Sequence, residues 1–316
     1  MPRLTFGIAL DFGSKLRPLD EQLERQSMLL ADAEAAGFEL VAAGESSTPG
    51  GFHLPNAVLV LATLAQRTGL GLCTGVVLLP AWPVWRLALD AAQLDQLSHG
   101  RLTLGIGLGS PSLQEHAGWA ADAIGATADE YLQCLHQLWL GAAEFSGTHV
   151  TAAGRLPIQP RNPKGIPVWV GGGIRTSAQR AARLGDGWYA GVSFPRSGIP
   201  RQVAAYRDAL DGRTGAVAVN RVALLAAAAS EVDDMAQRFV GGTLRSYAQA
   251  GLPLQDIVDD VALVGTPDQV ARQLEAYVAA GVTHVFARLS LDEMPLEVAR
   301  GTIELMGREV IPRFGS

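Results

Sequence analysis

Three consecutive glycines stand between a predicted strand and a predicted helix, in the segment VWVGGGIRTSAQRAARLGDGWY at residues 168–189. Glycine lets the backbone approach an anion closely, and the free amides at a helix N-terminus favour negative charge. The turn Gly171–Ile174 and the hydroxyl of Thr176 are therefore a candidate phosphate site. The alternative is a tight strand-to-helix turn that needs glycine only for its backbone angles.

A second group of glycines lies in residues 70–110, which contain two predicted strands joined by a helix. Gly75 interrupts an apolar strand, which indicates a bulge or a close backbone approach. Gly105, Gly107 and Gly109 alternate along the next strand and its exit. This spacing removes side chains from one face and leaves room for a flat ligand. The alternative is barrel packing, in which small residues balance large ones.

Few side chains suited to acid–base chemistry follow the predicted strands. Glu45 follows the second strand, where a carboxylate either orients a ligand, pairs with Arg288, or is buried in a structural pair. His53 and His116 lie on loops of the same kind and are the histidine candidates for proton transfer, the alternative being ordinary loop histidines. Aromatic side chains on these loops either wall a flat cofactor or plug the barrel rim; they are Trp82, Trp85 and Trp119.

A scaffold must position these residues. Strands alternate with helices along the chain, and this alternation predicts a parallel sheet. The strands are nearly continuous apolar runs, as expected when both faces of a sheet are covered. About eight such units fit a closed (β/α)₈ barrel, the TIM barrel, better than an open sheet. We expect one domain over residues 1–316, with a short extended insertion near 145–158. The predicted strands are 4–10, 38–43, 70–79, 102–107, 166–171, 187–190, 217–228 in part and 284–289. The predicted helices are 19–36, one from about 55, 84–97, 128–140, 176–184, 200–210, 232–250, 267–280 and 296–309.

Composition narrows the class of protein. The chain has 316 residues, of which 48% are hydrophobic and 18% are charged, so we expect a globular protein. Its net charge of −6 argues against nucleic-acid binding, which needs a concentrated basic face. Cys73 and Cys134 are too few for a disulfide scaffold and lack metal-binding spacing, so we expect no metal. No signal peptide and no apolar run of about 18 residues is visible, which favours a cytoplasmic protein without membrane spans.

Several segments together resemble the bacterial luciferase-like monooxygenase superfamily. They are TGVVLLP (74–80), LDQLSHGRLTLGIGLG (94–109), PVWVGGG (167–173), ARLGDGWY (182–189) and VGTPDQVARQLEAYVAAGVTHVFARL (264–289). Each segment alone is loose, but their order is specific, and the resemblance spans Phe6 to about Pro312.

The resemblance implies a barrel that binds reduced FMN or the deazaflavin coenzyme F420. It places the cofactor ring over a bulge at Thr74–Val76, with a cis peptide bond between Gly75 and Val76, and the phosphate end at the glycine turn. The cofactor-binding residues that follow are Thr74, Gly75, Val76, Gly107, Gly171, Gly172, Gly173, Ile174 and Thr176.

Two departures from the family pattern bear on mechanism. Many members have GEHH after the second strand, whereas this chain has GESS at 44–47, so Ser46 replaces a histidine that often helps proton transfer. A serine hydroxyl cannot act as that acid or base unaided. The hydroxyls of Ser46, Ser47 and Thr48 remain as hydrogen-bond donors. Leu108 stands where luciferase has a phosphate-binding arginine, which favours F420 or an FMN held by backbone amides.

The resemblance implies a flavin-dependent oxidoreductase, with a monooxygenase that uses reduced flavin and O₂ on a small organic substrate as the first interpretation. The alternatives are an F420-dependent hydride-transfer enzyme and a catalytically silent flavin-binding protein. A non-redox barrel lyase would need a Schiff-base lysine or a metal cluster, and Lys15 and Lys164 lie outside the predicted strands. The expected partners are a separate flavin reductase and a second copy of the chain, with Leu87, Leu89, Leu94 and Leu97 as candidate dimer contacts.

Overall fold

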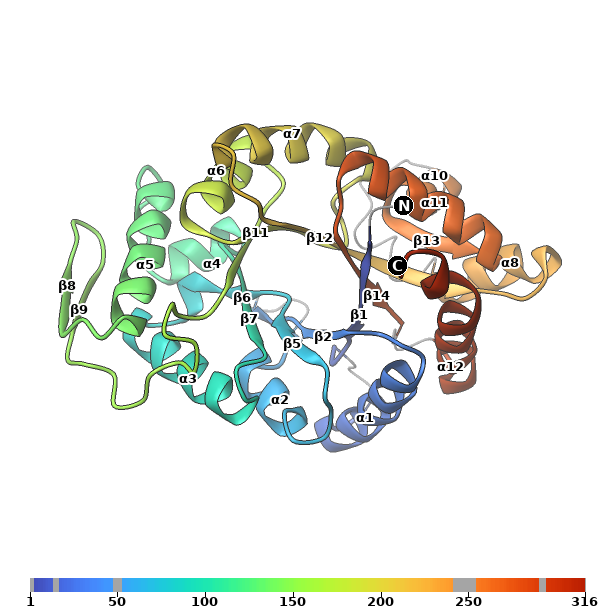
Figure 1. Ribbon diagram of the computed structural model, residues 1–316, viewed down its shortest axis with the longest axis horizontal. Coiled ribbons are helices and arrows are strands. Elements are labelled where there is room, and N and C mark those ends of the chain that lie inside the picture. Colours follow the sequence, from blue (N-terminus) through green and yellow to red (C-terminus); the bar gives the residue numbers. More distant parts are fainter. Residues whose placement is uncertain (1–2, 14–16, 48–52, 241–253, 290–293, 316) are drawn as a thin grey trace.

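The computed structural model describes residues 3–13, 17–47, 53–240, 254–289 and 294–315. In these residues eight parallel strands close into a barrel, seen end-on in Figure 1. The pairing of β7 with β10 completes the ring, which confirms the predicted (β/α)₈ fold. In order around the barrel the strands are β1 (Thr5–Leu10), β2 (Leu40–Ala43), β5 (Gly71–Thr74), β7 (Leu102–Gly107), β10 (Val168–Gly171), β11 (Gly187–Ala190), β12 (Ala216–Leu225) and β14 (His284–Arg288).

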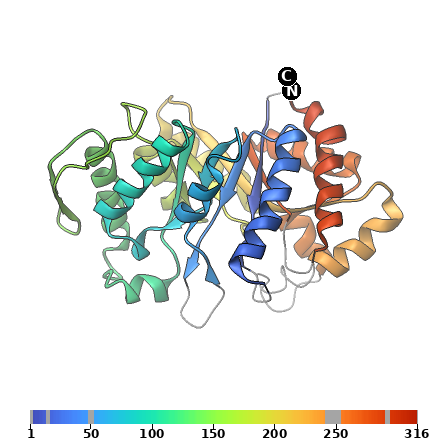
Figure 2. The ribbon, with the colours of Figure 1, turned by 90° about the horizontal axis from the view of Figure 1, so that it is seen from below.

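Helices cover the outside of the barrel (Figures 1 and 2). The helices of the main units are α1 (Leu19–Ala35), α2 (Ala57–Leu64), α3 (Val84–Leu97), α5 (Ile124–Trp139), α6 (Arg175–Leu184), α7 (Ile199–Leu210), α11 (Pro267–Ala280) and α12 (Leu296–Leu305). Both chain ends lie at the end of the barrel where the strands begin (Figure 2), and the amide of Leu4 donates to the carbonyl of Phe314 (3.1 Å). A functional site is therefore expected at the opposite end, the mouth.

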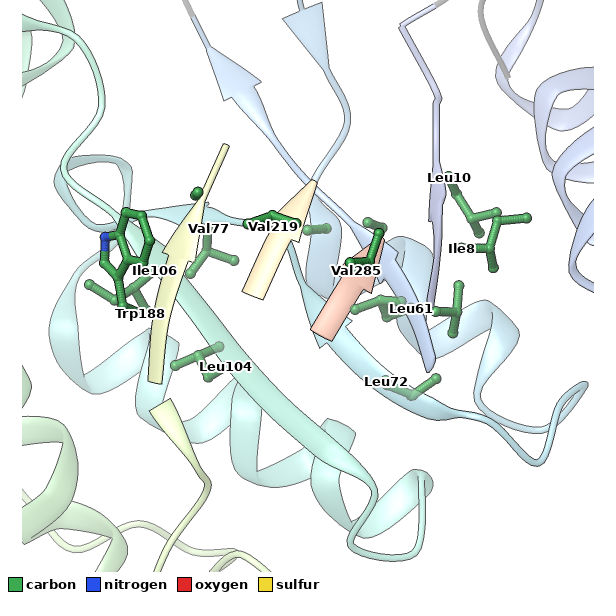
Figure 3. Close-up of a cluster of buried hydrophobic side chains, with 14 of the residues drawn as sticks. Ile8, Leu10, Leu61, Leu72, Val77, Leu104, Ile106, Trp188, Val219 and Val285 are labelled. Atoms are coloured by element: carbon green, nitrogen blue, oxygen red, sulfur yellow. The ribbon is translucent and has the colours of Figure 1, made fainter. Parts of the chain in front are cut away.

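Two sets of side chains fill the barrel wall. Outward-facing residues pack against the helices and form the main core shown in Figure 3; they include Ile8, Leu72, Leu104, Ile106, Val219 and Val285. Inward-facing residues fill the lumen; they are Ala9, Ala42, Cys73, Trp169, Tyr189, Ala218 and Phe286. Three aromatic rings and four small residues share the lumen, so the interior is a packed core rather than a channel.

The structure departs from the predicted elements mainly where the chain leaves the simple repeat. The predicted strand 70–79 is split into β5 and β6 (Val77–Leu78), because the chain bulges at Gly75 and Val76. The insertion is a hairpin of β8 (Glu144–Ser146) and β9 (Thr151–Ala153), followed by irregular backbone. The short helix α4 (Pro111–His116) was not predicted.

The region after β12 is the least well predicted. α8 begins at Ala229 and ends at Met235, and a π-helical turn follows at Ala236–Val240. The rest of the predicted helix 232–250 lies outside the described residues. α10 (Leu254–Val261) and β13 (Ala262–Gly265) were not predicted, and β13 pairs with the second half of β12. The single-domain organisation over 1–316 stays a prediction.

The candidate dimer contacts need correction. Leu87, Leu89 and Leu94 are buried in the core of the chain itself, because α3 presents them to the barrel and to its neighbours. Of the four leucines only Leu97 is exposed, at 49%. The homodimer stays a prediction without these three residues as support. Among the described residues, no helix combines the length and apolarity required to cross a bilayer.

Candidate active site

A bulge between β5 and β6 lies at the mouth. The peptide bond between Gly75 and Val76 is cis, as predicted. The amide of Gly75 donates to the carbonyl of Ala43 (2.8 Å), and the carbonyl of Val76 accepts from the amide of Glu45 (3.0 Å). Both partners belong to the exit of β2, so the neighbouring strand holds the bulge at both residues. The buried hydroxyl of Thr74 donates to the carbonyl of Gly105 (2.7 Å) and ties the bulge to β7.

The alternating glycines of β7 make room for this bulge. A Cβ atom at Gly105 would overlap the carbonyl oxygen of Thr74, and one at Gly107 would lie 2.8 Å from Cγ2 of Val76. A Cβ atom at Gly171 would lie 3.5 Å from Cγ1 of Val76. The space that the spacing predicts for a flat ligand is thus filled by Val76, which supports the packing interpretation. A cofactor contact at Gly107 stays a prediction.

Glu45 fastens the bulge to the segment that follows it. One carboxylate oxygen, Oε1, accepts from the amide of Leu78 (2.8 Å) and from the indole nitrogen of Trp82 (2.7 Å). Burial raises the pKa of Glu45, and the two hydrogen bonds oppose that shift by favouring the charged carboxylate. These hydrogen bonds give Oε1 of Glu45 a structural role, and a role of Glu45 toward a ligand stays a prediction.

Arg288 pairs with another carboxylate at the mouth. Its Nε and Nη2 donate to Oδ2 of Asp11 (3.1 and 2.8 Å), and the amide of Gly13 donates to Oδ1 (3.0 Å). Both side chains are about nine-tenths buried. Asp11 directly follows β1, and Arg288 is the last residue of β14, which pairs with β1. The ion pair therefore joins the exits of these two strands. Glu45 was one candidate partner of Arg288, and Asp11 was not predicted.

A polar pair lies inside the barrel next to the bulge. The hydroxyl of Tyr189 would lie 2.8 Å from a Cβ atom at Gly75, and it accepts from the side-chain amide of Asn220 (3.0 Å). Burial raises the pKa of Tyr189 far above its ordinary value, so the phenol stays protonated. Neither residue is predicted as part of the site. The available signal was AVAVNRV at 216–222, where strand alternation puts Asn220 on the same face as Ala218.

The glycine turn is exposed at the end of β10 and its carbonyls are anchored by side chains. The indole of Trp188 donates to the carbonyl of Gly172 (2.8 Å), and the side-chain amide of Gln202 donates to the carbonyl of Gly173. Gly172 has φ = 144°, a conformation that favours glycine. The amides of Gly172 and Ile174 donate within the protein, to the carbonyl of Tyr189 (3.4 Å) and to Oγ of Ser177 (3.3 Å). The described hydrogen bonds therefore leave the amide of Gly173 and the exposed Thr176 at the start of α6 for a ligand.

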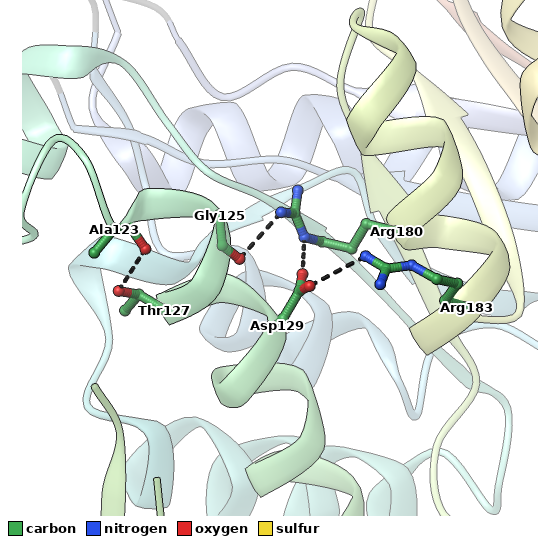
Figure 4. A network of polar contacts seen from close by, with 6 residues as sticks. All are labelled: Ala123, Gly125, Thr127, Asp129, Arg180 and Arg183. Atoms are coloured by element: carbon green, nitrogen blue, oxygen red, sulfur yellow. Dashed lines mark hydrogen bonds and ion pairs between the residues drawn. The ribbon is translucent and has the colours of Figure 1, made fainter. Parts of the chain in front are cut away.

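An ion-pair network holds α6 against α5 (Figure 4). Asp129 on α5 accepts from Arg180 and from Arg183 (3.1 Å), and Arg180 also donates to the carbonyl of Gly125 (3.1 Å). Arg180 is buried, whereas Arg183 is exposed, so the Arg180 contact is the one shielded from water. The network fixes the helix whose N-terminus carries the glycine turn.

The other candidates for catalysis are the hydroxyl and histidine residues after β2 and at the end of α4. Ser46 belongs to β3 (Ser46–Ser47) and His53 to β4 (His53–Leu54), which form an antiparallel pair after β2. The side chains of Ser47 and His53 and all of Thr48 lie outside the described residues. His116 is exposed at the end of α4. The structure therefore brings no described histidine to the bulge.

The three tryptophans differ in position. Trp82 contacts Glu45 at the mouth, and Trp119 packs against the ring of Tyr131 with centroids 6.4 Å apart. The indole of Trp85 donates to the carbonyl of Gly154 in the insertion (2.8 Å). Trp82 therefore lies beside the bulge, while Trp85 anchors the insertion.

Comparison with known proteins agrees with this architecture. A family model described as luciferase-like monooxygenase matches residues 4–284. The solved structure of monooxygenase RslO1 from Streptomyces bottropensis has a TM-score of 0.84, with 24% identity, and the match covers 99% of this chain and 100% of that chain. At this identity the likeness shows the fold alone.

Curated relatives are oxidoreductases of two kinds. The chain is 32% identical to 4-hydroxyprotoasukamycin monooxygenase of Streptomyces nodosus subsp. asukaensis, over 99% of this chain and 93% of that protein. It is 32% identical to the oxygenase component of a flavin-dependent trigonelline monooxygenase of Acinetobacter baylyi, over 48% and 42%. It is also 27% identical to a putative coenzyme F420-dependent oxidoreductase of Mycobacterium tuberculosis, over 82% and 89%. The chain therefore belongs to the luciferase-like monooxygenase family and is an oxidoreductase of that class.

Proposed function

We propose that this protein is a monooxygenase that binds reduced FMN and uses O₂ to oxygenate a small organic substrate. The observation that carries the proposal is the arrangement of the mouth, where the bulge at Gly75–Val76 adjoins Gly171 of the exposed glycine turn. A flat ring and a phosphate are the two parts of FMN that such features fit. The 32% identity to a monooxygenase over almost the whole chain favours oxygenation over other flavin chemistry.

The protein residues would act by binding and positioning. The turn Gly171–Ile174 would hold the phosphate through the amide of Gly173 and the amides at the start of α6, with the hydroxyl of Thr176, and Thr74–Val76 would support the ring. When bound, reduced FMN supplies the electrons that activate O₂. Glu45 holds the bulge in place through Leu78 and Trp82. The ring of Trp82 would restrict water at the mouth. Ser46 would donate a hydrogen bond at the reaction site, in place of the imidazole of other family members.

The pH dependence of the oxygenation rate tests the proposed role of Ser46 as a hydrogen-bond donor. We expect the oxygenation rate to stay flat across pH values around 6.5, the ordinary pKa of histidine, because a serine hydroxyl does not titrate there. His116→Ala and His53→Ala should leave the rate within about threefold of the wild type. The assignment is wrong if either variant loses activity by about 100-fold and the acid limb of the profile disappears with it.

The alternative function is F420-dependent hydride transfer, which the 27% identical mycobacterial relative and the leucine at position 108 favour. A silent flavin-binding protein is the third possibility. For the monooxygenase we also propose a separate flavin reductase as partner, because one relative is the oxygenase component of a flavin-dependent monooxygenase.

Titration of the purified protein with each coenzyme separates these functions. We expect reduced FMN to quench tryptophan fluorescence under anaerobic conditions and to bind at least tenfold more tightly than reduced F420. Addition of O₂ and substrate should then give one molecule of oxygenated product for each molecule of substrate consumed. Tighter binding of F420, with substrate turnover in the absence of O₂, would establish the alternative. FMN binding without turnover across a broad substrate panel would indicate the silent protein.

A further inference from the structure

Arg221 is a fully buried cation on the outer face of β12. Its Nε donates to the hydroxyl of Tyr277 on α11 (2.7 Å), and its Nη1 donates to the carbonyls of Asn220 (2.7 Å) and Gly191 (3.2 Å). The guanidinium also lies 5.3 Å from the centre of the Tyr277 ring. Its Nη2 is buried and has no hydrogen-bond partner among the described residues.

The charge of Arg221 lacks the compensation that other buried arginines have. In the described part of the chain, Arg180 pairs with Asp129 and Arg288 pairs with Asp11, whereas Arg221 contacts only neutral groups. A buried charge without an opposite partner is costly, because carbonyls and an aromatic face replace only part of its hydration. A cation in this state favours the binding of an anion nearby, since attraction is weakly screened in the protein interior.

Gly191 and Phe194 connect Arg221 with the glycine turn. The carbonyl of Gly191, which Arg221 holds, also accepts from the amide of Phe194 (3.0 Å). The ring of Phe194 lies against the turn, because a Cβ atom at Gly173 would come within 2.9 Å of its Cδ2. β11 also pairs directly with β10, from which the turn begins. Arg221 therefore lies behind Gly191 and Phe194, the residues against which the turn packs, and does not reach the surface of the turn.

We propose that Arg221 is an electrostatic positioning residue for the phosphate of the cofactor, with its positive charge acting through the β11 exit rather than by contact. The inference rests on the proposed function, since it takes the glycine turn as the phosphate site. Arg221 would supply the positive charge that luciferase has as an arginine at the position where this chain has Leu108. The ligand class is a flavin or deazaflavin that carries a phosphate ester.

The test compares ligands that differ only in the phosphate. Dissociation constants of reduced FMN and reduced riboflavin are measured by fluorescence quenching for the wild type and for Arg221→Met, which has similar bulk and no charge. We expect the wild type to bind FMN at least tenfold more tightly than riboflavin. In Arg221→Met this preference should fall at least fivefold, while riboflavin affinity stays within twofold. The same comparison applies to F420 and its phosphate-free deazariboflavin core.

Two control variants separate charge from packing. Arg221→Lys keeps the charge and should keep most of the phosphate preference. Tyr277→Phe removes the hydroxyl that accepts from Nε and should lower thermal stability without changing the preference. If Arg221→Met does not fold, Arg221→Gln replaces it in the same measurement.

Specific outcomes overturn the inference. An unchanged FMN-to-riboflavin preference in a folded, uncharged variant would show that Arg221 is only structural. Equal loss of both affinities would show the same. A wild type that binds FMN and riboflavin equally refutes the inference while leaving flavin binding intact, whereas a wild type that binds neither FMN nor F420 refutes the proposed function as well.

Discussion

Gly105→Ala should lower the free energy of unfolding by about 3 kcal/mol, or prevent folding. The added methyl group would overlap the carbonyl oxygen of Thr74, which is a backbone atom and cannot rotate away. To relieve the overlap, β5 must separate from β7, and the hydrogen bond from the Thr74 hydroxyl to Gly105 would break. Denaturant unfolding of the purified variant measures the loss.

Gly301→Ala is the matched control, because it makes the same chemical change at a site with space. Gly301 lies inside α12, and apart from its chain neighbours and the backbone of its own helix, no described atom lies within 4 Å of a Cβ atom placed there. Alanine is favoured over glycine in a helix by about 0.5–1 kcal/mol, so this variant should be more stable than the wild type. Equal stability of Gly105→Ala and Gly301→Ala would mean that β5 has room to shift, contrary to the geometry described.

Periodic patterns predicted the barrel well because each repeat follows the same physical rule. The predicted bounds of β7, β11, α3 and α11 agree with the structure at both ends. In these elements apolar runs or periodic apolar faces coincide with clear terminal signals, such as the capping Thr266 ahead of Pro267 and the left-handed Gly281 after α11. The local sequence therefore marks where such elements begin and end.

Elements that depend on distant contacts were missed. β13 is a four-residue strand whose pairing partner, the second half of β12, lies about 40 residues earlier, so no local period marks it. The sequence left two interpretations of the space beside Gly107 open for a similar reason. Glycine spacing shows where side chains are missing, but only the fold shows that Val76 fills the gap.

The candidate site was predicted where backbone shape defines it and missed where side chains from separate strands meet. Motif resemblance located the cis bond at Gly75–Val76. The pairs Asp11–Arg288 and Tyr189–Asn220 join residues far apart in sequence, and each member alone is an unremarkable polar residue. Barrel closure brings them together, which single-sequence patterns do not encode.

Replacement of Glu45 with alanine should cost about 2–4 kcal/mol of stability and weaken cofactor binding. The carboxylate accepts from the amide of Leu78 and the indole of Trp82, and both donors would lose their partner in a half-buried site. The bulge would then lose one of the contacts that hold it, so the proposed ring-binding surface at Thr74–Val76 should become less ordered. Thermal unfolding and the dissociation constant of reduced FMN give the two measurements.

Glu45→Gln is the control that separates hydrogen bonding from charge. Its amide oxygen still accepts from Leu78 and Trp82, so we expect stability within about 1 kcal/mol of the wild type. Since burial raises the folded-state pKa of Glu45 above its ordinary value of 4.5, its contribution is present below that value and is lost as the pH rises through the folded pKa. Glutamine does not titrate, so its stability relative to the wild type should increase with pH across this range. If the alanine variant matched the glutamine variant in both stability and FMN affinity, Glu45 would not hold the bulge.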